Sequence, residues 1–270
     1  MKTILLIGST GYVGKKLKHK LSKNYTLICP GRKIGFDIRK KNELRKYLKE
    51  NIDLVINLTG QQTKNRRLMT ETIIQGNKNI LEITSRIKKN ILLIYISTSL
   101  VYGNSEKQLT ENSKKNPVYA YEKLKYKIEK EYIKNKKNYL ILRFSNLYGS
   151  KKKSGIISNI LNSIKNKKEF YFDNINTFKN FIHIDDVINI IEYLISKNIR
   201  NKVLNIANQN ICFKNLAKTL VKITNNSFRF SNKDINISQT LSQKIDNKVI
   251  KNIIKKYKFK TLESFLNNEI

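Results

Sequence analysis

The sequence is poor in the residues that mark several common protein classes. Its 270 residues include two Cys, two Pro, ten Gly, two His and no Trp. Two cysteines, Cys29 and Cys212, are too few for a disulfide scaffold or a cysteine-rich zinc module. The low Pro and Gly content excludes collagen-like and proline-rich chains. Because the two histidines, His19 and His183, are far apart in the sequence, we expect no metal site.

Long hydrophobic runs are also absent. The first apolar run, Ile4–Ile7, is too short for the core of a signal peptide, and the longest clean run, Ile91–Ile96, is too short to cross a bilayer. We therefore expect a cytoplasmic protein without a membrane partner. A hydrophobic fraction of 40% over 270 residues is nevertheless enough to build a sizeable core.

Acidic residues are scarce, so the chain carries a strong excess of positive charge. Lys and Arg number 54 against 20 Asp and Glu, which gives a formal net charge of +34. Such a charge is typical of nucleic-acid-binding proteins. However, only nine of the 54 basic residues are Arg, the residue that grips phosphate bidentately. Lys, Asn and Ile are all abundant and share AT-rich codons. We therefore interpret the charge as a compositional bias and expect no nucleic-acid partner.

Short apolar runs alternate along the chain with longer segments of helical period. The runs predict buried strands at Thr3–Ile7, Thr26–Cys29, Leu54–Leu58, Leu92–Ser97, Tyr139–Phe144 and Val203–Ile206. The longer segments predict helices at Gly14–Ser22, Asn42–Glu50, Arg66–Lys88, Tyr119–Lys134, Ile156–Lys167 and Asp186–Ser196. This alternation predicts an α/β fold with a Rossmann-type, doubly wound parallel sheet. We expect residues 1–150, joined by 177–208, to form the Rossmann domain. Residues 151–176 and 209–270 are expected to form a small C-terminal lobe.

The first predicted strand leads directly into a glycine-rich turn with the spacing G-x-x-G-x-x-G. Gly8 permits a tight turn, Gly11 lets the backbone approach a pyrophosphate, and Gly14 lets the following helix pack closely on the strand. The N–H groups at the start of that helix would face the anion. The turn therefore predicts a dinucleotide site formed by Gly8, Thr10, Gly11, Tyr12, Val13 and Gly14.

The end of the second predicted strand lacks the acid that often binds the ribose 2′-hydroxyl of NAD. The sequence there is Cys29-Pro30-Gly31-Arg32-Lys33. Cations at this position suit a 2′-phosphate, and Arg32 carries most of this inference because Lys is common throughout the chain. We therefore predict NADP as the cofactor, with NAD as the alternative.

A hydroxyl-rich strand end and a Tyr–Lys pair form the candidate catalytic group. A predicted strand ends in Ser97-Thr98-Ser99, and further along Tyr119 and Lys123 lie four residues apart in a predicted helix, which places them on one face. A Lys ammonium beside a phenol lowers the pKa of the phenol, so Tyr119 could act as a general acid or base. Tyr121 and Lys125 have the same spacing.

Other segments follow in a regular order along the chain: Phe36–Arg39, Val55–Gly60, Ile96–Gly103, Leu142–Gly149 and Phe181–Val187. Together with the glycine turn and the Tyr–Lys helix, these segments resemble the extended short-chain dehydrogenase/reductases, the group of nucleotide-sugar epimerases, dehydratases and reductases. The resemblance extends along the whole chain. It implies a two-lobe enzyme in which the C-terminal lobe binds a nucleotide-diphosphate sugar beside a nicotinamide cofactor.

The resemblance implies a role for each candidate residue. Tyr119 would exchange a proton with the sugar, Lys123 would bond the nicotinamide ribose, and Thr98 would hydrogen-bond the reacting oxygen. Besides the glycine turn, the implied cofactor contacts are Arg32, Asp37, Ile38, Leu58, Thr59, Gly60, Tyr119, Lys123 and Phe144. The implied substrate contacts are Thr98, Ser99, Asn146 and Lys179.

Departures from the family pattern narrow the reaction. Ser99 and Leu100 stand where the dehydratases of the group carry an Asp-Glu pair, so dehydration is not expected. Lys179 replaces an Arg that commonly grips the diphosphate, which keeps the charge but loses the bidentate geometry. The short link from Cys29 to Asp37 resembles the reductases of the group. We expect a 4-keto-sugar reductase in surface-polysaccharide biosynthesis, with an NAD-dependent nucleotide-sugar 4-epimerase as the alternative.

The resemblance also implies a homodimer. Its interface would be a four-helix bundle formed by the predicted helices Arg66–Lys88 and Tyr119–Lys134 of two copies. In the same family the position of His183 is structural, and we expect a structural role for it here.

Overall fold

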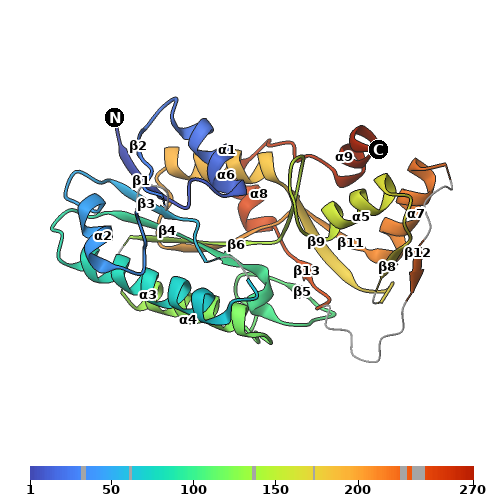
Figure 1. The fold of residues 1–270 in the computed structure, drawn as a ribbon, viewed down its shortest axis with the longest axis horizontal. Coiled ribbons are helices and arrows are strands. Elements are labelled where there is room, and N and C mark those ends of the chain that lie inside the picture. The colour runs from blue at the N-terminus through green and yellow to red at the C-terminus, as the bar shows by residue number, and fades with distance from the viewer. Residues whose placement is uncertain (32–34, 61–62, 136–137, 173, 226–229, 233–240) are drawn as a thin grey trace. The chain divides into compact units, whose positions relative to one another are not determined.

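The structure, a computed structural model, describes residues 1–31, 35–60, 63–135, 138–172, 174–225, 230–232 and 241–270 (Figure 1). The chain divides into two compact units. Unit 1 consists of residues 1–101, 117–143 and 188–204, and unit 2 of residues 102–116, 144–187 and 205–270. We predicted residues 102–116, 144–150, 177–187 and 205–208 within the Rossmann domain. The structure assigns these four segments to unit 2. The first three contain strands that pair with strands of that unit.

Unit 1 is built on a six-stranded sheet whose strands lie close to the predicted ones. They are β1 (Thr3–Ile7), β2 (Thr26–Ile28), β3 (Leu54–Asn57), β4 (Leu92–Thr98), β6 (Tyr139–Phe144) and β10 (Lys202–Ile206). Their order is β10-β6-β4-β3-β1-β2, and β1 pairs in parallel with both β2 and β3. The chain reverses its direction of progress across the sheet between β1 and β3. This makes the carboxyl end of β1 a topological switch point, the place where open α/β sheets bind ligands.

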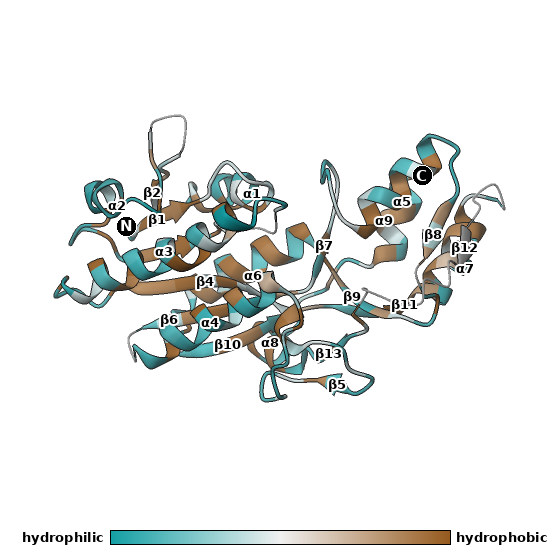
Figure 2. Cartoon of the chain, turned by 60° about the horizontal axis from the view of Figure 1, so that its bottom comes forward, coloured by the Kyte–Doolittle hydropathy of each residue, from teal (hydrophilic) through white to brown (hydrophobic). Residues whose placement is uncertain are grey.

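Helices cover both faces of this sheet. They are α1 (Tyr12–Leu21), α2 (Lys41–Tyr47), α3 (Arg66–Ser85), α4 (Ala120–Lys134) and α6 (Ile184–Ser196). Figure 1 shows α3 and α4 on one face and α1 and α6 on the other. The buried side of α3 is marked by Met69, Ile73, Ile80 and Ile83, a helical spacing that puts them on one face. Figure 2, coloured by hydropathy, agrees with this arrangement. The strands β1 and β4 are hydrophobic, whereas the helices α3 and α4 have both hydrophobic and hydrophilic residues.

A buried polar network ties the end of β3 to α3 and α4. The Asn57 amide donates to Asn77 Oδ1 at 3.0 Å, and the Tyr132 hydroxyl donates to the same oxygen at 2.9 Å. Asn57 Oδ1 accepts from the backbone N–H and the hydroxyl of Thr59, at 3.0 and 2.7 Å. Because buried polar groups without partners are costly, this network fixes the start of the loop that follows β3.

A buried ion pair joins α4 to β6. Arg143 Nη2 lies 2.6 Å from Glu129 Oε2, and the two side chains are 3% and 0% exposed. Arg143 Nε also donates to Glu129 Oε1 at 3.0 Å. Separating such a pair would leave an uncompensated charge inside the protein. The pair therefore holds α4 in one register on the sheet and decides which α4 side chains face inward.

Unit 2 contains several short strands that the sequence pattern did not predict. A sheet with the order β11-β9-β7 is formed by β7 (Asn146–Tyr148), β9 (Phe178–His183) and β11 (Gln209–Cys212). Two further pairs join β5 (Gln108–Leu109) to β13 (Lys244–Ile245) and β8 (Phe170–Phe172) to β12 (Phe230–Asn232). The helices are α5 (Ile156–Lys165), α7 (Phe213–Ile223), α8 (Lys248–Ile254) and α9 (Leu262–Glu269). Side chains of α5, α7 and α9 pack around Phe172 and Phe181 in a core of their own. In the described parts of the chain, every helix is too short or too polar to cross a bilayer.

Candidate active site

The glycine turn joins β1 to α1 and is closed by backbone contacts. Gly11 N–H donates to the Gly8 carbonyl at 3.1 Å, and Gly8 has a φ of 84°, which favours glycine. A Cβ on Gly14 would lie 2.2 Å from the Gly8 oxygen, so this position admits no side chain. The helix starts at Tyr12 without an acidic residue in its first turn, and its N–H groups therefore form a cradle suited to an anion.

The loop after β3 lies directly against this turn. A Cβ on Gly8 would lie 3.2 Å from Leu58 Cβ and 3.4 Å from Thr59 Cγ2. Gly60 has a φ of 81°, and a Cβ there would lie 2.6 Å from Ile73 Cγ1. The structure thus brings the predicted cofactor residues Leu58, Thr59 and Gly60 to the glycine turn.

The segment after β2 approaches the turn from the other side. A Cβ on Gly31 would lie 3.8 Å from Thr10 Cγ2, and Phe36 N–H donates to the Gly31 carbonyl at 3.3 Å. The predicted cofactor residues Asp37 and Ile38 follow in this segment, and Ile38 is buried. Arg32, on which the preference for NADP was based, lies outside the described residues.

Three buried hydroxyl groups mark the end of β4. Ser97, Thr98 and Ser99 are 2%, 8% and 3% exposed, and Thr98 Oγ1 accepts from the Leu100 N–H at 3.3 Å. A short 3-10 helix, η2 (Ser99–Tyr102), follows at once. Because β4 pairs in parallel with β3, the carboxyl ends of both strands lie at the same edge of the sheet. Thr98 and the loop of Thr59 therefore share that edge.

The predicted Tyr–Lys pair does not reach this edge. The helix α4 starts at Ala120, and Tyr119 is its N-cap residue, with an extended backbone of φ −95° and ψ 167°. Tyr119 is 42% exposed, and Lys123 is exposed as well. Tyr119 thus lies just outside the helix and Lys123 on its solvent side, so the i, i+4 relation does not place both on the inner face.

Lys125 is the lysine of α4 that enters the site. It is 3% exposed, and its Nζ donates to the Ile96 carbonyl at 2.9 Å and to the Thr59 carbonyl at 3.5 Å. The ammonium also lies 5.1 and 5.7 Å from the ring centres of Tyr95 and Tyr121, within the range of cation–π attraction. Burial lowers the pKa of Lys125 to about 7, although Glu129 acts in the opposite direction. Lys125 therefore links the loop after β3 to the end of β4.

Tyr121 lies one helical turn before Lys125. It is half-buried, and burial raises the pKa of its phenol, with a further contribution from the charge of Glu122. Glu122 is 1% exposed, and its Oε1 has no hydrogen-bond partner among the described residues. Tyr121 is therefore a protonated phenol one helical turn from a buried lysine, and it can give up its proton where a cation stabilises the phenolate left behind. The structure therefore places Tyr121 and Lys125 where the sequence interpretation favoured Tyr119 and Lys123.

A signal for this second pair was present in the sequence. Tyr121, Lys125, Ile128 and Tyr132 follow a 4-3-4 spacing along one helix face, and all four are buried or half-buried. The alternative face, which contains Lys123, continues with further lysines and no large apolar residue at the same spacing. Hydrophobic periodicity therefore distinguishes the two pairs, which the Tyr–Lys spacing alone does not.

Three other predicted residues lie in unit 2. Phe144 is 8% exposed at the end of β6. Asn146 Nδ2 donates to the Asn180 carbonyl at 2.9 Å. Lys179 is 8% exposed, and its Nζ donates to the Leu241 carbonyl at 2.6 Å. The ammonium of Lys179 is thus engaged by the backbone of its own unit.

His183 is also held within unit 2. Its Nδ1 accepts from the Asp185 N–H at 3.2 Å, and its ring packs edge-on against Tyr148, with centroids 5.2 Å apart. These contacts account for the burial of His183 by packing within unit 2. Across the residues that the structure describes, no group of three or more His, Cys, Asp or Glu side chains is placed to hold a metal ion.

A glycine cradle at the switch point of a parallel sheet, with a buried lysine between two strand ends, is typical of dinucleotide-binding α/β proteins. The chain belongs to the NAD dependent epimerase/dehydratase family, which matches residues 4–207. The predicted resemblance to the extended short-chain dehydrogenase/reductases, and the predicted Rossmann-type α/β fold, are thereby confirmed.

Curated relatives include two enzymes. The chain is 28% identical over 172 residues to ADP-L-glycero-D-manno-heptose-6-epimerase of Brachyspira hyodysenteriae, covering 58% of this chain and 54% of that protein. It is 27% identical over 273 residues to dTDP-D-glucose 4,6-dehydratase of Dictyostelium discoideum, covering 83% of this chain and 62% of that protein. The chain therefore matches less than two thirds of the length of these relatives.

Solved structures share the fold over nearly the whole chain. The UDP-glucose 4-epimerase of Thermotoga maritima, solved with UDP-glucose, has a TM-score of 0.82 at 19% identity and covers 98% of this chain and 96% of that one. The RMD protein of Pseudomonas aeruginosa, complexed with NADPH, has a TM-score of 0.82 at 20% identity and covers 100% and 97%. At identities of 19% and 20%, the structural similarity supports the fold alone.

Proposed function

We propose that this chain is an NAD(P)-dependent oxidoreductase that acts on a nucleotide-diphosphate sugar, most specifically a 4-keto-sugar reductase in surface-polysaccharide biosynthesis. The observation that carries the proposal is Lys125, a buried lysine that joins the loop of Thr59 to the end of β4 with Tyr121 one turn away. Burying an ammonium group that is not paired with a carboxylate costs free energy. A lysine with only a structural role would therefore not be expected at this buried position.

The residues present fit a nicotinamide dinucleotide. In the cradle of Gly8, Gly11 and Gly14, the position of Gly14 admits no side chain and Gly8 has a positive φ. The helix α1 begins there, and the free N–H groups of a helix start suit an anion. Leu58, Thr59 and Gly60 would line the path from this cradle toward Lys125. When bound, the cofactor supplies hydride chemistry. The 2′-phosphate of NADP or the 2′-hydroxyl of NAD would lie beyond the cradle, near the segment after β2.

The chain's own residues would act on the substrate oxygen. Tyr121 Oη would donate a proton to the carbonyl oxygen of the keto sugar as the carbinol forms. Thr98 Oγ1, at the same edge of the sheet, would hydrogen-bond that oxygen and hold it in place. Lys125 Nζ would bond the nicotinamide ribose and, in its protonated form, favour the phenolate that remains on Tyr121 after the transfer. Asn146 and Lys179 of unit 2 would contact the sugar nucleotide.

An NAD-dependent nucleotide-sugar 4-epimerase is the second candidate. It is favoured by the similarity to an epimerase among the curated relatives. In an epimerase, Tyr121 would first take a proton from a sugar hydroxyl and later return it, and the cofactor would be regenerated within each turnover.

One experiment separates the two candidates. Purified protein is mixed with NADPH or NADH and a dTDP-4-keto-6-deoxy sugar, and the oxidation of the nicotinamide is followed by its absorbance. A reductase consumes one reduced cofactor for each sugar reduced. Interconversion of UDP-glucose and UDP-galactose without net cofactor consumption would contradict the reductase assignment and support the epimerase.

A homodimer through α3 and α4 is part of this proposal. The outward side of α4 carries Lys123, Lys127, Lys130 and Lys134, all exposed. Two copies paired through this face would bring like charges together, so we expect dimerisation to strengthen as salt screens them. Sedimentation velocity at low and high salt tests this expectation, and a dimer that weakens with salt would contradict it.

A further inference from the structure

Glu122, the residue that follows the proposed proton donor Tyr121, carries a buried carboxylate. The residue is 1% exposed, and its Oε1 is buried without a hydrogen-bond partner among the described residues. A second buried carboxylate of α4 differs from it, because Glu129 is bonded through both oxygens to Arg143. Burying a carboxylate without a bonded cation costs free energy. The presence of Glu122 beside the candidate site therefore calls for an explanation.

The start of α4 favours a negative charge at this position. Tyr119, the N-cap residue, makes no side-chain cap bond to the helix, and Glu122 lies in the first turn. The free backbone N–H groups at a helix start form the positive end of the helix dipole, which stabilises an anion in the first turn. This end of the helix therefore offsets part of the cost of burying the charge of Glu122.

Tyr121 has two groups of opposite charge near it on its own helix. Glu122 follows it directly, and Lys125 Nζ lies 5.7 Å from the centre of its ring. The other lysines of α4 are exposed, and Glu129 is paired with the arginine of β6. Tyr95 is the only titratable residue of β4, and burial raises the pKa of its phenol, so that it stays uncharged. Within the described part of unit 1, the buried charges beside Tyr121 are therefore those of Glu122 and Lys125.

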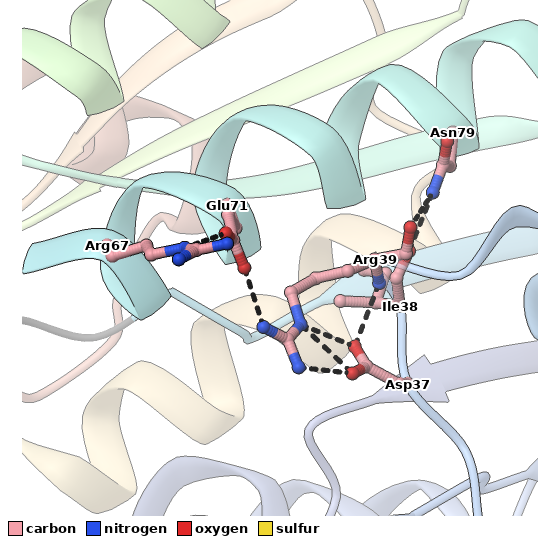
Figure 3. A network of polar contacts seen from close by, with 6 residues as sticks. All are labelled: Asp37, Ile38, Arg39, Arg67, Glu71 and Asn79. Atoms are coloured by element: carbon pink, nitrogen blue, oxygen red, sulfur yellow. Dashed lines mark hydrogen bonds and ion pairs between the residues drawn. The ribbon is translucent and has the colours of Figure 1, made fainter. Parts of the chain in front are cut away.

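The charged side chains of α3, which packs against α4, lie outside this buried group. Glu71 is bonded to Arg67 and to Arg39, and Arg39 is bonded in turn to Asp37 (Figure 3). The remaining charged residues of α3 and of the loop before it are exposed: Lys64, Arg66, Lys78 and Glu82. Across the residues that the structure describes, α3 therefore adds no buried charge beside Tyr121.

The charge of Glu122 opposes that of Lys125 at the phenol. Burial raises the pKa of Tyr121, and the carboxylate of Glu122 raises it further. Burial also lowers the pKa of Lys125 to about 7, so the ammonium is largely discharged above that pH. In the alkaline range Glu122 then acts on the phenol without a balancing cation, and the protonated form of Tyr121 is favoured.

We propose that Glu122 is a positioning residue that acts through Tyr121, and that its buried carboxylate keeps the phenol protonated until the keto sugar binds. The inference rests on the proposed function, in which Tyr121 must hold a proton when the substrate arrives. The Oη–H bond of Tyr121 then breaks as its proton passes to the sugar oxygen, and the phenolate left behind takes a new proton from solvent. Repulsion between the phenolate and the carboxylate of Glu122 favours this return of the proton.

The first test follows the ionisation of Tyr121 without substrate. Each chain is titrated by the ultraviolet absorbance of phenolate, and the titration of the same chain carrying Tyr121→Phe is subtracted, which isolates one residue among 14 tyrosines. Glu122→Gln removes the charge and keeps the size of the side chain. The midpoint of Tyr121 should fall by about one pH unit in this variant, the order expected for a nearby unit charge inside a protein.

Three further variants show whether charge is the cause. Glu122→Asp keeps the charge and should leave the midpoint close to the wild-type value. Glu122→Leu lacks the charge and buries no polar atom, so it should show the same shift as Glu122→Gln. Glu131→Gln is the matched control, because it removes a half-buried carboxylate two turns further along the same helix, and its midpoint should not move.

The second test is the pH dependence of kcat/KM for the reduction of a keto sugar. The alkaline limb, where Tyr121 loses its proton, should move to lower pH in Glu122→Gln by the shift seen in the titration. The limb should stay in place in Glu122→Asp and Glu131→Gln.

The outcomes separate this inference from the proposed function. An unchanged midpoint in both Glu122→Gln and Glu122→Leu would overturn the inference, and so would an equal shift in Glu131→Gln. A loss of activity that is the same at every pH would reflect a merely structural role and would also overturn it. If the wild-type protein reduces no keto sugar with NADPH or NADH, the proposed function fails, whereas the titration still decides whether Glu122 controls the proton of Tyr121.

Discussion

Lys125 Nζ lies 2.9 Å from the carbonyl oxygen of Ile96, so a lysine of α4 is bonded to the backbone near the end of β4. The same nitrogen reaches the Thr59 carbonyl in the loop after β3. Two strand ends and one helix are thus joined by a single side chain. Because the sheet is parallel between β3 and β4, this junction lies at the edge where α/β sheets bind their ligands.

Replacing Tyr121 by Phe removes the proposed proton donor. We expect kcat to fall by about 1,000-fold, within the range lost with a general acid or base, while cofactor affinity is retained. Tyr119→Phe is the matched control, because Tyr119 is an exposed N-cap residue two positions away, and it should keep near-normal turnover. Steady-state kinetics with the substrate found for the wild-type enzyme measures both. A larger loss in Tyr119→Phe would reverse the assignment.

Lys125→Met should weaken both cofactor binding and turnover. The expected loss in kcat/KM is about 100-fold, since the variant loses the group that positions cofactor and phenol together. Lys123→Met removes an equally large cation from the exposed side of the same helix and should change kcat/KM less than twofold or so. Equal effects of the two variants would show that only general charge matters.

Lys125 also makes stability depend on pH. Its pKa is lowered from 10.5 to about 7 by burial, so between these values the unfolded chain binds more protons than the folded one. The contribution of Lys125 to the free energy of unfolding should therefore rise with pH from about 7 upward. Its limiting slope is about 1.4 kcal/mol per pH unit. Urea unfolding from pH 7 to 10 checks this. The slope should be smaller in Lys125→Met, and identical slopes would mean that Lys125 is not buried as a neutral amine.

The ion pair of Arg143 and Glu129 holds α4 on β6. Removing one partner, as in Arg143→Met, leaves a buried carboxylate unpaired and should cost about 3–5 kcal/mol in the free energy of unfolding. The double variant Arg143→Met/Glu129→Leu should recover much of this loss, because no charge then remains buried. Chemical denaturation measures both variants. If the double variant is no more stable than the single one, the loss of stability comes from lost packing and not from the unpaired charge.

Gly14→Ala tests the glycine cradle. A Cβ at this position would lie 2.2 Å from the Gly8 carbonyl oxygen and 2.7 Å from Ser9 Cα, so α1 must shift and cofactor affinity should fall by at least about tenfold. Gly31→Ala is the control, because among the described residues a Cβ there meets only Thr10 Cγ2, at 3.8 Å. Calorimetry with NAD and NADP gives both affinities. Normal binding by Gly14→Ala would place the pyrophosphate elsewhere.

By itself, the sequence determined the fold class, the strands of unit 1 and the position of the glycine turn. These features depend on hydrophobic period and on local backbone freedom, which are properties of neighbouring residues. The family was also evident from ordered motifs along the chain. The short strands of unit 2 escaped prediction because each has few residues, and their pairing depends on partners far away in the chain, as for β5 and β13.

The hydrophobic spacing of α4 favours one Tyr–Lys pair, but the tertiary structure decided which pair reaches the site. Tyr119 with Lys123 and Tyr121 with Lys125 have the same spacing, so the spacing could not distinguish them. The decision lies in the first residue of α4 and in the rotation of that helix on the sheet, which the buried contact of Glu129 with Arg143 fixes. In the same way, only side-chain geometry shows that Arg39 balances the charge of Asp37, because the physics of a site depends on distances that a linear sequence does not contain.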